Sequence, residues 1–173
     1  PLLLYGETGT GKTVLARAVA RRLTGKPALE VGEEAVTDIR PLLGLRTVDK
    51  KGAYVIFGTP IGRALTGKKT SRDKVSDGGS IAYLDDVGKY PPEALRAMVK
   101  QISGRRPGEK ISFAAWAGEE EPVAENFGLM MSTNLPSVRH PDRPTWPIEV
   151  RRELGGLEID YIPQSKENPE LYE

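Results

Sequence analysis

The chain has 173 residues, of which 38% are hydrophobic and 28% charged, and its 25 basic and 24 acidic residues leave a formal net charge of +1. This length is typical of one domain with a sizeable core, and the balanced charge does not favour nucleic acid or a membrane surface as a partner. The absence of cysteine excludes disulfides and thiolate metal sites, and without an apolar run of membrane-spanning length or a signal peptide we expect a cytoplasmic protein with no membrane partner.

The N-terminal segment predicts a strand, a glycine-rich loop and a helix in succession. Residues 1–5 form a short apolar run of strand length, and residues 13–23 repeat apolar side chains at helical spacing. Between them, residues 6–13 read GETGTGKT and match G-x-x-x-x-G-K-[ST] at every fixed position. The glycines allow a tight turn whose N–H groups point inward at a helix N-terminus, where backbone dipoles favour an anion. We therefore expect this loop to bind the phosphates of a nucleoside triphosphate.

Two side chains of this loop have predicted roles in chemistry. The Lys12 ammonium is expected to reach the β- and γ-phosphates, and the Thr13 hydroxyl is expected to ligate Mg²⁺. The predicted cofactors are therefore ATP or ADP together with Mg²⁺. The residues expected to bind the nucleotide are Gly6, Glu7, Thr8, Gly9, Thr10, Gly11, Lys12, Thr13 and Val14.

The rest of the chain alternates between predicted strands and helices. Apolar runs predict strands at residues 28–31, 80–84, 111–117, 127–132 and 157–162. Helical patterns cover residues 38–45, 59–65 and 92–102. Strands that alternate with helices imply an α/β fold with a largely parallel sheet covered on both faces. The sequence divides into a core at residues 1–163 and a polar tail at residues 164–173.

Three segments outside this alternation are less specific. Residues 52–58, GAYVIFG, are an apolar aromatic run bracketed by glycines, which is either buried against the sheet or a loop that grips a substrate polypeptide. Residues 67–79 are polar and glycine-rich, and their basic side chains are typical of a solvated surface loop. The acidic residues 119–121 are compatible with a hairpin connection.

The second chemical motif is IAYLDDV at residues 81–87, an apolar strand that ends in two carboxylates. The carboxyl end of a parallel strand lies at the same sheet edge from which the phosphate loop departs. At that edge Asp85 can bind Mg²⁺ through its water shell, and Asp86 can orient or deprotonate an attacking water. We therefore predict that Asp85 is a metal-site residue and that Asp86 is a catalytic one.

The third motif is MSTN at residues 131–134, where the next buried strand ends. The Asn134 amide offers both a donor and an acceptor, so at the same sheet edge it could hydrogen-bond the γ-phosphate or the attacking water. The alternative is that Asn134 only begins a turn ahead of Pro136. Its place at the end of a strand favours the catalytic interpretation.

Taken in order, these motifs resemble the AAA+ ATPases. GETGTGKT, LDDV, STN and the later EVRREL look like the Walker A, Walker B, sensor 1 and arginine-finger stations of that family. Within the family, FGTPIGRALTGK at residues 57–68 and DDVGKYPPEALRAMVKQI at residues 85–102 look most like the dynein-related and MoxR-like branch. The resemblance covers nearly the whole chain.

The resemblance implies a three-layer P-loop NTPase fold, with a parallel five-stranded sheet in the order 5-1-4-3-2 and helices on both faces. It also implies a homo-oligomer, usually a hexameric ring, whose sites lie between subunits. Arg152, or its neighbour Arg151, would enter the adjacent subunit's site and supply positive charge to the γ-phosphate. The small helical lid of the family has no counterpart after Pro163, so the resemblance implies a piece of a longer protein.

One departure from the family affects the expected activity. The family usually carries Glu where this chain has Asp86, whose side chain is one methylene shorter, and a general base misplaced by about 1 Å can cost on the order of a hundredfold in rate. The expected function is ATP binding and Mg²⁺-dependent hydrolysis that drives chaperone-like remodelling of a protein partner. Two alternatives stay open: a nucleotide-dependent scaffold or switch with negligible turnover, and a nucleic-acid motor or loader.

Overall fold

The computed structural model describes residues 1–31, 43–48, 51–52, 54–70, 74–112, 120–134 and 155–158. The statements below concern these residues. Several sequence predictions fall outside them, namely those for residues 38–42, 113–117 and 159–162, for the polar tail, and for Arg151 and Arg152, the two candidates for the arginine finger.

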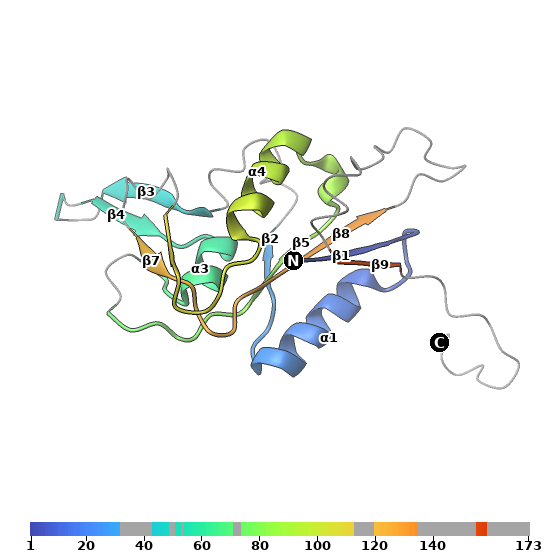
Figure 1. Cartoon of the computed structure of the whole chain (residues 1–173), viewed down its shortest axis with the longest axis horizontal. Helices are drawn as coiled ribbons and strands as arrows, with labels where there is room; N and C mark the ends of the chain where they lie inside the picture. Colours follow the sequence, from blue (N-terminus) through green and yellow to red (C-terminus); the bar gives the residue numbers. More distant parts are fainter. Residues whose placement is uncertain are drawn as a thin grey trace, which may run out of the picture.

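A parallel sheet forms the centre of the described structure (Figure 1). Its strand order is β2-β5-β8-β1-β9, and each pair of neighbouring strands is parallel. The strands are β1 (Leu2–Gly6), β2 (Leu29–Val31), β5 (Ile81–Leu84), β8 (Gly128–Asn134) and β9 (Gly155–Glu158). The expected α/β class, with a parallel sheet and helices, is confirmed.

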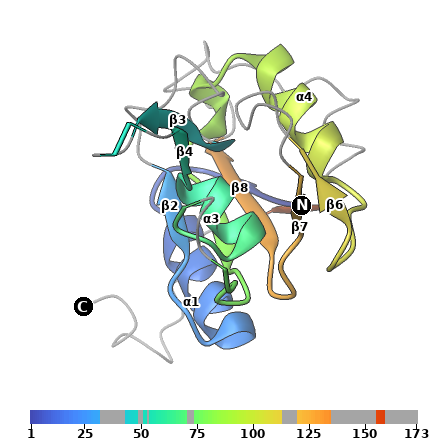
Figure 2. The same ribbon diagram turned by 90° about the vertical axis from the view of Figure 1, so that its left-hand side faces the viewer.

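Helices cover both faces of this sheet (Figures 1 and 2). Helix α1 (Lys12–Thr24) packs on one face, where Ala16 and Ala20 contact a cluster that contains Leu4, Tyr83 and Met130. Helices α3 (Pro60–Thr66) and α4 (Pro92–Ile102) pack on the other face with Leu3, Leu84 and Met131. Neighbouring residues of a strand point to opposite faces, which is why adjacent strand residues belong to different clusters.

The helix predictions at residues 13–23, 59–65 and 92–102 are confirmed to within a residue or two. Glycine and proline explain the boundaries. Gly25 and Gly67 end α1 and α3 in the left-handed conformation, which glycine adopts without steric cost, and α3 and α4 carry proline in the first turn, where its missing N–H has no helical partner.

Two antiparallel strand pairs flank the core and differ from the sequence predictions. Strand β3 (Leu45–Val48) pairs with β4 (Tyr54–Phe57), so the helix predicted to include Leu45 is wrong at that residue. Strand β6 (Lys110–Ile111) pairs with β7 (Glu121–Pro122), which confirms a hairpin at this place, but Glu121 belongs to a strand and not to the connection, and the strand predicted at residues 111–117 is wrong at Ser112. Whether these segments form strands depends on pairing with a partner strand, and the local sequence pattern does not identify that partner.

The segment at residues 67–79 is only in part the solvated loop that the sequence predicted. Gly67 and Gly79 are buried because the loop folds back onto α3, where Asp77 N–H donates to Gly67 O at 2.8 Å and Ser80 N–H donates to Ala64 O at 3.2 Å. Gly79 has φ +73°, and a Cβ added there would lie 2.4 Å from Ala64 O and 2.6 Å from Ala124 Cβ.

We therefore expect Gly79→Ala to lower the free energy of unfolding by about 3 kcal/mol, since both the left-handed backbone and the close neighbours oppose a side chain. The matched control is Gly104→Ala. Gly104 has φ +77° but no described atom within 4 Å of an added Cβ, so this change should cost only about 1 kcal/mol. Urea denaturation followed by circular dichroism measures both values, and equal losses would show that the close approach at Gly79 contributes nothing.

Candidate active site

Three parallel strands end together at the edge where the sequence predicts the site. Strand β1 runs into the glycine-rich loop, β5 runs into Asp85 and Asp86, and β8 ends at Asn134. In the register of β1 with β8, Gly6 is paired with Asn134. The sheet therefore brings residues from separate segments of the chain to one edge, as the alternation of strands and helices predicts.

The glycine-rich loop turns through positive φ angles at Gly6 (156°), Gly9 (88°) and Gly11 (85°). Gly11 is also the N-cap of α1, and no side chain caps the N–H groups of that helix end. Glu7, Thr8 and Gly9 are exposed, and so is Val14, at 68%. The loop thus has an accessible rim at a helix N-terminus, which is the setting that backbone phosphate binding requires.

Lys12 lies under this loop and is only 7% exposed. Its ammonium donates to Glu7 O at 2.6 Å, to Gly6 O at 3.1 Å and to Asn134 Oδ1 at 3.0 Å. The contact with Asn134 joins residues 122 positions apart in the chain. The structure therefore brings together the two side chains that the sequence assigns to the phosphate end of the site.

A second group of polar side chains surrounds Asp85. Its Oδ1 accepts hydrogen bonds from Ser132 Oγ at 2.5 Å, from Tyr83 Oη at 3.0 Å and from Asp86 N–H at 3.0 Å. Thr13 Oγ1 lies 3.3 Å from Asp85 Oδ2 and 3.1 Å from Tyr83 Oη. The sequence analysis assigned roles to Thr13 and Asp85 but missed Tyr83 and Ser132. The available signal was strand periodicity, because residues 83 and 85 lie on one face of the strand and its extension.

Burial and hydrogen bonding act in opposite directions on the pKa of Asp85. Burial is the largest single influence and raises the pKa, but the hydrogen bonds from Ser132, Tyr83, the Asp86 amide and Thr13 together lower it below its ordinary value. Asp85 therefore stabilises the fold as an anion above the pKa of its unfolded state, and that contribution is lost as the pH falls through the lower folded-state pKa. Burial raises the pKa of Tyr83, so its hydroxyl remains a donor at neutral pH.

The donors around Asp85 fit a hard divalent cation. A carboxylate oxygen and a threonine hydroxyl, 3.3 Å apart, are oxygen ligands of the kind that Mg²⁺ takes. Among the described residues no group of three or more His, Cys, Asp or Glu gathers in one place. Mg²⁺ keeps several waters and shares phosphate oxygens, so the two protein oxygens of Thr13 and Asp85 suit it.

Asp86 has an unusual backbone for a residue other than glycine. Its φ of 46° and ψ of 53° place it in the left-handed region, at the N-cap of the short 3₁₀ helix η2 (Val87–Lys89). Its N–H also lies 3.2 Å from Ser132 Oγ, and its carboxylate pairs with Lys89 Nζ at 3.3 Å. Asp tolerates this region better than most residues, so the strain is modest. The predicted catalytic carboxylate is thus fixed by an ion pair three residues away.

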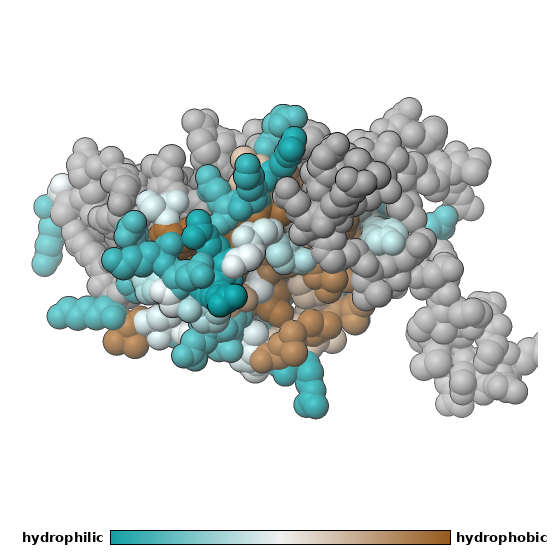
Figure 3. All heavy atoms as spheres, viewed as in Figure 1, coloured by the Kyte–Doolittle hydropathy of each residue, from teal (hydrophilic) through white to brown (hydrophobic). Residues whose placement is uncertain are grey.

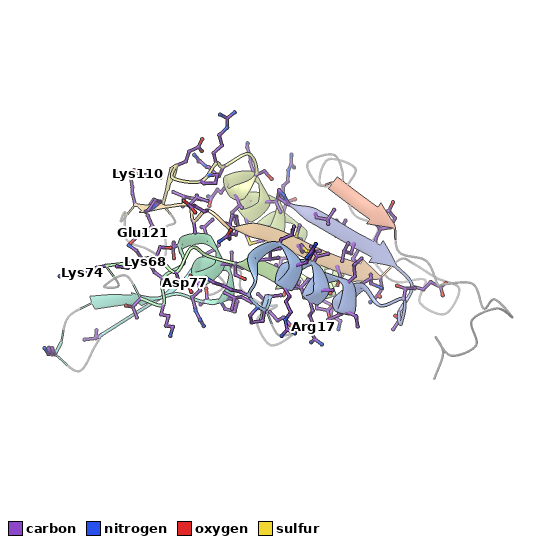
Figure 4. The ribbon with its side chains drawn as sticks, turned by 90° about the horizontal axis from the view of Figure 1, so that it is seen from below. Arg17, Lys68, Lys74, Asp77, Lys110 and Glu121 are labelled. Carbon is purple, nitrogen blue, oxygen red and sulfur yellow. The ribbon has the colours of Figure 1, made fainter. Side chains whose placement is uncertain are left out.

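The opposite edge of the sheet carries a different polar cluster. Lys68 pairs with Glu121 at 2.6 Å, and both side chains are largely buried, so this lysine is not simply solvated (Figure 4). A cavity of about 160 Å³ beside it is lined by residues that include Lys26 and Ser80, which precede β2 and β5. Asp85 follows β5, so this cavity is separate from the site described above.

The remaining surface of the described residues shows no membrane-spanning feature. Apolar side chains are visible along α1 in Figure 3, where Val14 is 68% and Leu23 is 70% exposed. None of the described helices has both the length and the apolarity needed to cross a membrane. Arg151 and Arg152, the two candidates for the arginine finger, lie outside the described residues.

Comparison with known proteins supports the resemblance drawn from the motifs. The solved structure of NtrX from Brucella abortus is similar, with a TM-score of 0.56 and 19% sequence identity over 93% of this chain and 32% of that chain. At this identity the likeness concerns the fold, and the chain spans about a third of the length of NtrX. The family described as "AAA domain (dynein-related subfamily)" matches residues 1–145. The chain therefore belongs to the dynein-related subfamily of AAA domains, a family of nucleotide-binding ATPases.

Proposed function

We propose that this chain binds ATP with Mg²⁺ and hydrolyses it at the edge of β1, β5 and β8. The observation that carries the proposal is the meeting of Lys12 with Asn134 at 3.0 Å and of Thr13 with Asp85 at 3.3 Å. In a P-loop ATPase these are the groups that hold the phosphates and the metal. Mg²⁺ would supply charge to the leaving phosphoryl oxygens, and the residues proposed to hold it are Thr13 and Asp85.

Each remaining residue has a role that follows from its position. The backbone N–H groups from Gly6 to Val14 would face the phosphates, while Lys12 would neutralise the β- and γ-phosphates. Asn134 would orient the γ-phosphate or the attacking water through its amide. Asp86 would polarise that water, and Arg151 or Arg152 would act from an adjacent subunit of a ring. We further propose that ATP hydrolysis drives remodelling of a protein partner, as in MoxR-like, chaperone-like proteins.

A second function, a nucleotide-dependent scaffold or switch with little turnover, is favoured by one observation. The Asp86 carboxylate pairs with Lys89, and the Asp86 backbone is held in the left-handed region by its place at the start of η2. A water-activating carboxylate that is short and engaged in an ion pair would be a poor base. ATP occupancy could then set an interface between subunits without rapid hydrolysis.

The two functions are separated by Asp86→Glu, because the longer side chain moves the carboxylate by about 1 Å, a displacement that can be worth on the order of a hundredfold in rate. The measurement is steady-state phosphate release with Mg²⁺, beside the ATP dissociation constant. If the natural chain turns ATP over and Asp86→Glu changes the rate little, hydrolysis is the function. If the natural chain binds ATP but releases no phosphate, and Asp86→Glu gains a large rate, the switch is the function.

The control for that comparison is Lys89→Met, which keeps the length of the side chain but removes its charge. It leaves Asp86 in place and breaks the ion pair at 3.3 Å. A gain in turnover in Lys89→Met would attribute the low rate to the ion pair. No gain would attribute it to the length of Asp86. A chain that binds no ATP in any of these forms contradicts both functions.

A further inference from the structure

We propose that the cavity at the amino edge of the central sheet binds a phosphate group, at a site separate from the nucleotide site and independent of the proposed function. The cavity has a volume of about 160 Å³, which is below the roughly 300–1,000 Å³ of sites for drug-sized ligands and suits a single ionised group. The described side chains that line it include four basic ones, Lys26, Arg63, Lys68 and Lys69, and one acidic one, Asp77.

The parallel sheet separates this cavity from the nucleotide site. Lys26 and Pro27 lie between α1 and β2, and Gly79 and Ser80 lie directly before β5. The proposed nucleotide site lies beyond the carboxyl end of β5, a strand of four residues, so the two edges are about 13 Å apart. None of the described residues that line the cavity is among those assigned to ATP.

The walls of the cavity are fixed by hydrogen bonds between separate segments of the chain. Lys26 Nζ donates to Asp77 O and, at 3.1 Å, to Gly79 O, and it lies 3.3 Å from Asp77 Oδ1. Ser80 Oγ donates to Pro27 O at 3.0 Å. These contacts tie the residues before β5 to the residues before β2. The cavity is therefore held open by the fold and is more than a space beside an untethered loop.

Two of the four basic side chains already have partners. Lysine has three N–H donors, and Lys26 directs them at the two carbonyls and the carboxylate named above. Lys68 Nζ lies 2.6 Å from Glu121 Oε2, beside α3 (Figure 4). These two lysines hold the walls together, so contacts with a ligand would fall chiefly to Arg63 and Lys69.

Arg63 provides the strongest indication of an anion. It lies in the last turn of α3 and is partly buried, and among the residues that the structure describes no carboxylate pairs with it. Its stem is held in place, since a Cβ added at Gly58 would lie 2.6 Å from Arg63 Cγ. A charged group that is partly removed from water is costly unless it is neutralised, and a guanidinium can form two parallel hydrogen bonds with phosphate oxygens.

A phosphate group fits this cavity better than a carboxylate. A phosphoryl group carries about −1.5 to −2 charges at neutral pH, whereas a carboxylate carries one. A wall with four basic side chains and one acidic side chain favours the larger negative charge. The volume excludes a whole nucleotide, so the phosphate would enter as the free ion or as one phosphoryl group on a partner.

The test is titration of the natural chain with inorganic phosphate, followed by the amide NMR signals of Gly79 and Ser80, beside acetate at equal ionic strength. We expect saturable shifts with a dissociation constant on the order of 1 mM or tighter for phosphate, and weaker binding of acetate. Arg63→Met keeps the stem but removes the charge, and it should weaken phosphate binding by about tenfold or more. The source is decided by N-acetyl phosphoserine amide, which should bind at least as tightly as inorganic phosphate if the group belongs to a partner, and more weakly if the free ion is the ligand.

The glycine-rich loop can also bind phosphate, and its response is read separately from the amides of Gly9 and Gly11. Lys12→Ala should change the response of those two amides and leave the response of Gly79 and Ser80 unaltered. If neither phosphate nor ATP shifts Gly9 and Gly11 while phosphate still shifts Gly79 and Ser80, the proposed function fails and this inference stands.

The matched control is Arg22→Met, which removes the same charge from the exposed end of α1, outside the cavity. Its phosphate affinity should change by less than about twofold, and a loss equal to that of Arg63→Met would overturn the inference, because it would indicate general attraction to positive charge. An amide response that is absent, or equal for acetate, would also overturn it, since Arg63 would then serve only the carbonyl end of α3.

A second variant, Lys69→Met, decides the question if Arg63→Met does not fold. Lys69 lines the same cavity but is exposed, so its removal should weaken phosphate binding by about two- to fivefold. An affinity equal to that of the natural chain would contradict the inference.

Discussion

The Lys12→Ala variant is expected to lose ATP turnover by about 10²–10³-fold, the usual effect of removing one group that stabilises transition-state charge. The Lys12 ammonium is nearly buried and lies between Glu7 O at 2.6 Å and Asn134 Oδ1 at 3.0 Å. These acceptors are neutral oxygens, and a charged phosphate oxygen forms the stronger hydrogen bond with an ammonium group. ATP can therefore draw Lys12 from the loop carbonyls, and alanine removes that interaction together with the positive charge.

The measurement is steady-state phosphate release per subunit, with the ATP dissociation constant determined by calorimetry on the same preparations. Lys26→Ala is the matched control, because Lys26 Nζ also donates to backbone carbonyls, those of Asp77 and of Gly79, but at the opposite end of α1. Its removal should leave turnover unchanged to within about twofold. Comparable losses in both variants would mean that Lys12 acts only by holding the loop.

The parts of the site that the sequence predicts correctly are those whose chemistry is local. The glycine-rich loop is continuous in the chain, and its positive φ angles at Gly9 and Gly11 are values that few other residues adopt. The convergence of Asp85 and Asn134 follows from one further rule, that parallel strands present their carboxyl ends at the same edge. For these residues, motif and topology together predict which side chains lie close to one another, but they do not predict which atoms are in contact.

The parts that could not be predicted depend on contacts between distant segments. Tyr83 reads as one more apolar residue of a buried strand, and only the register of β5 with β8 and the approach of α1 bring its hydroxyl between Thr13 and Asp85. The left-handed backbone of Asp86 depends on the short helix η2, and no sequence pattern predicts that helix. The helix predicted at Leu45 is overridden by pairing with Phe57 in β4.

The second large effect is expected at the arginine pair. Replacing both Arg151 and Arg152 by alanine should lower turnover by about 10³-fold if one of them completes the site of an adjacent subunit. Both residues lie outside the described part of the chain and beyond residues 1–145, which the family matches, so this prediction rests on the resemblance of the EVRREL segment to the family's arginine-finger station. The rate per subunit of the natural chain should rise with protein concentration, because a site completed by a neighbour exists only in the assembled form.

Mixing two inactive variants tests this arrangement more directly than either variant alone. Lys12→Ala has a defective phosphate site but intact arginines. The Arg151→Ala, Arg152→Ala double variant has an intact phosphate site but cannot supply an arginine to the adjacent subunit. If the arginines act in the adjacent subunit, a mixture contains interfaces where an intact site meets an intact arginine pair, and turnover returns in part. If they act within their own subunit, each subunit keeps its own defect, and the mixture stays as inactive as its components at every concentration.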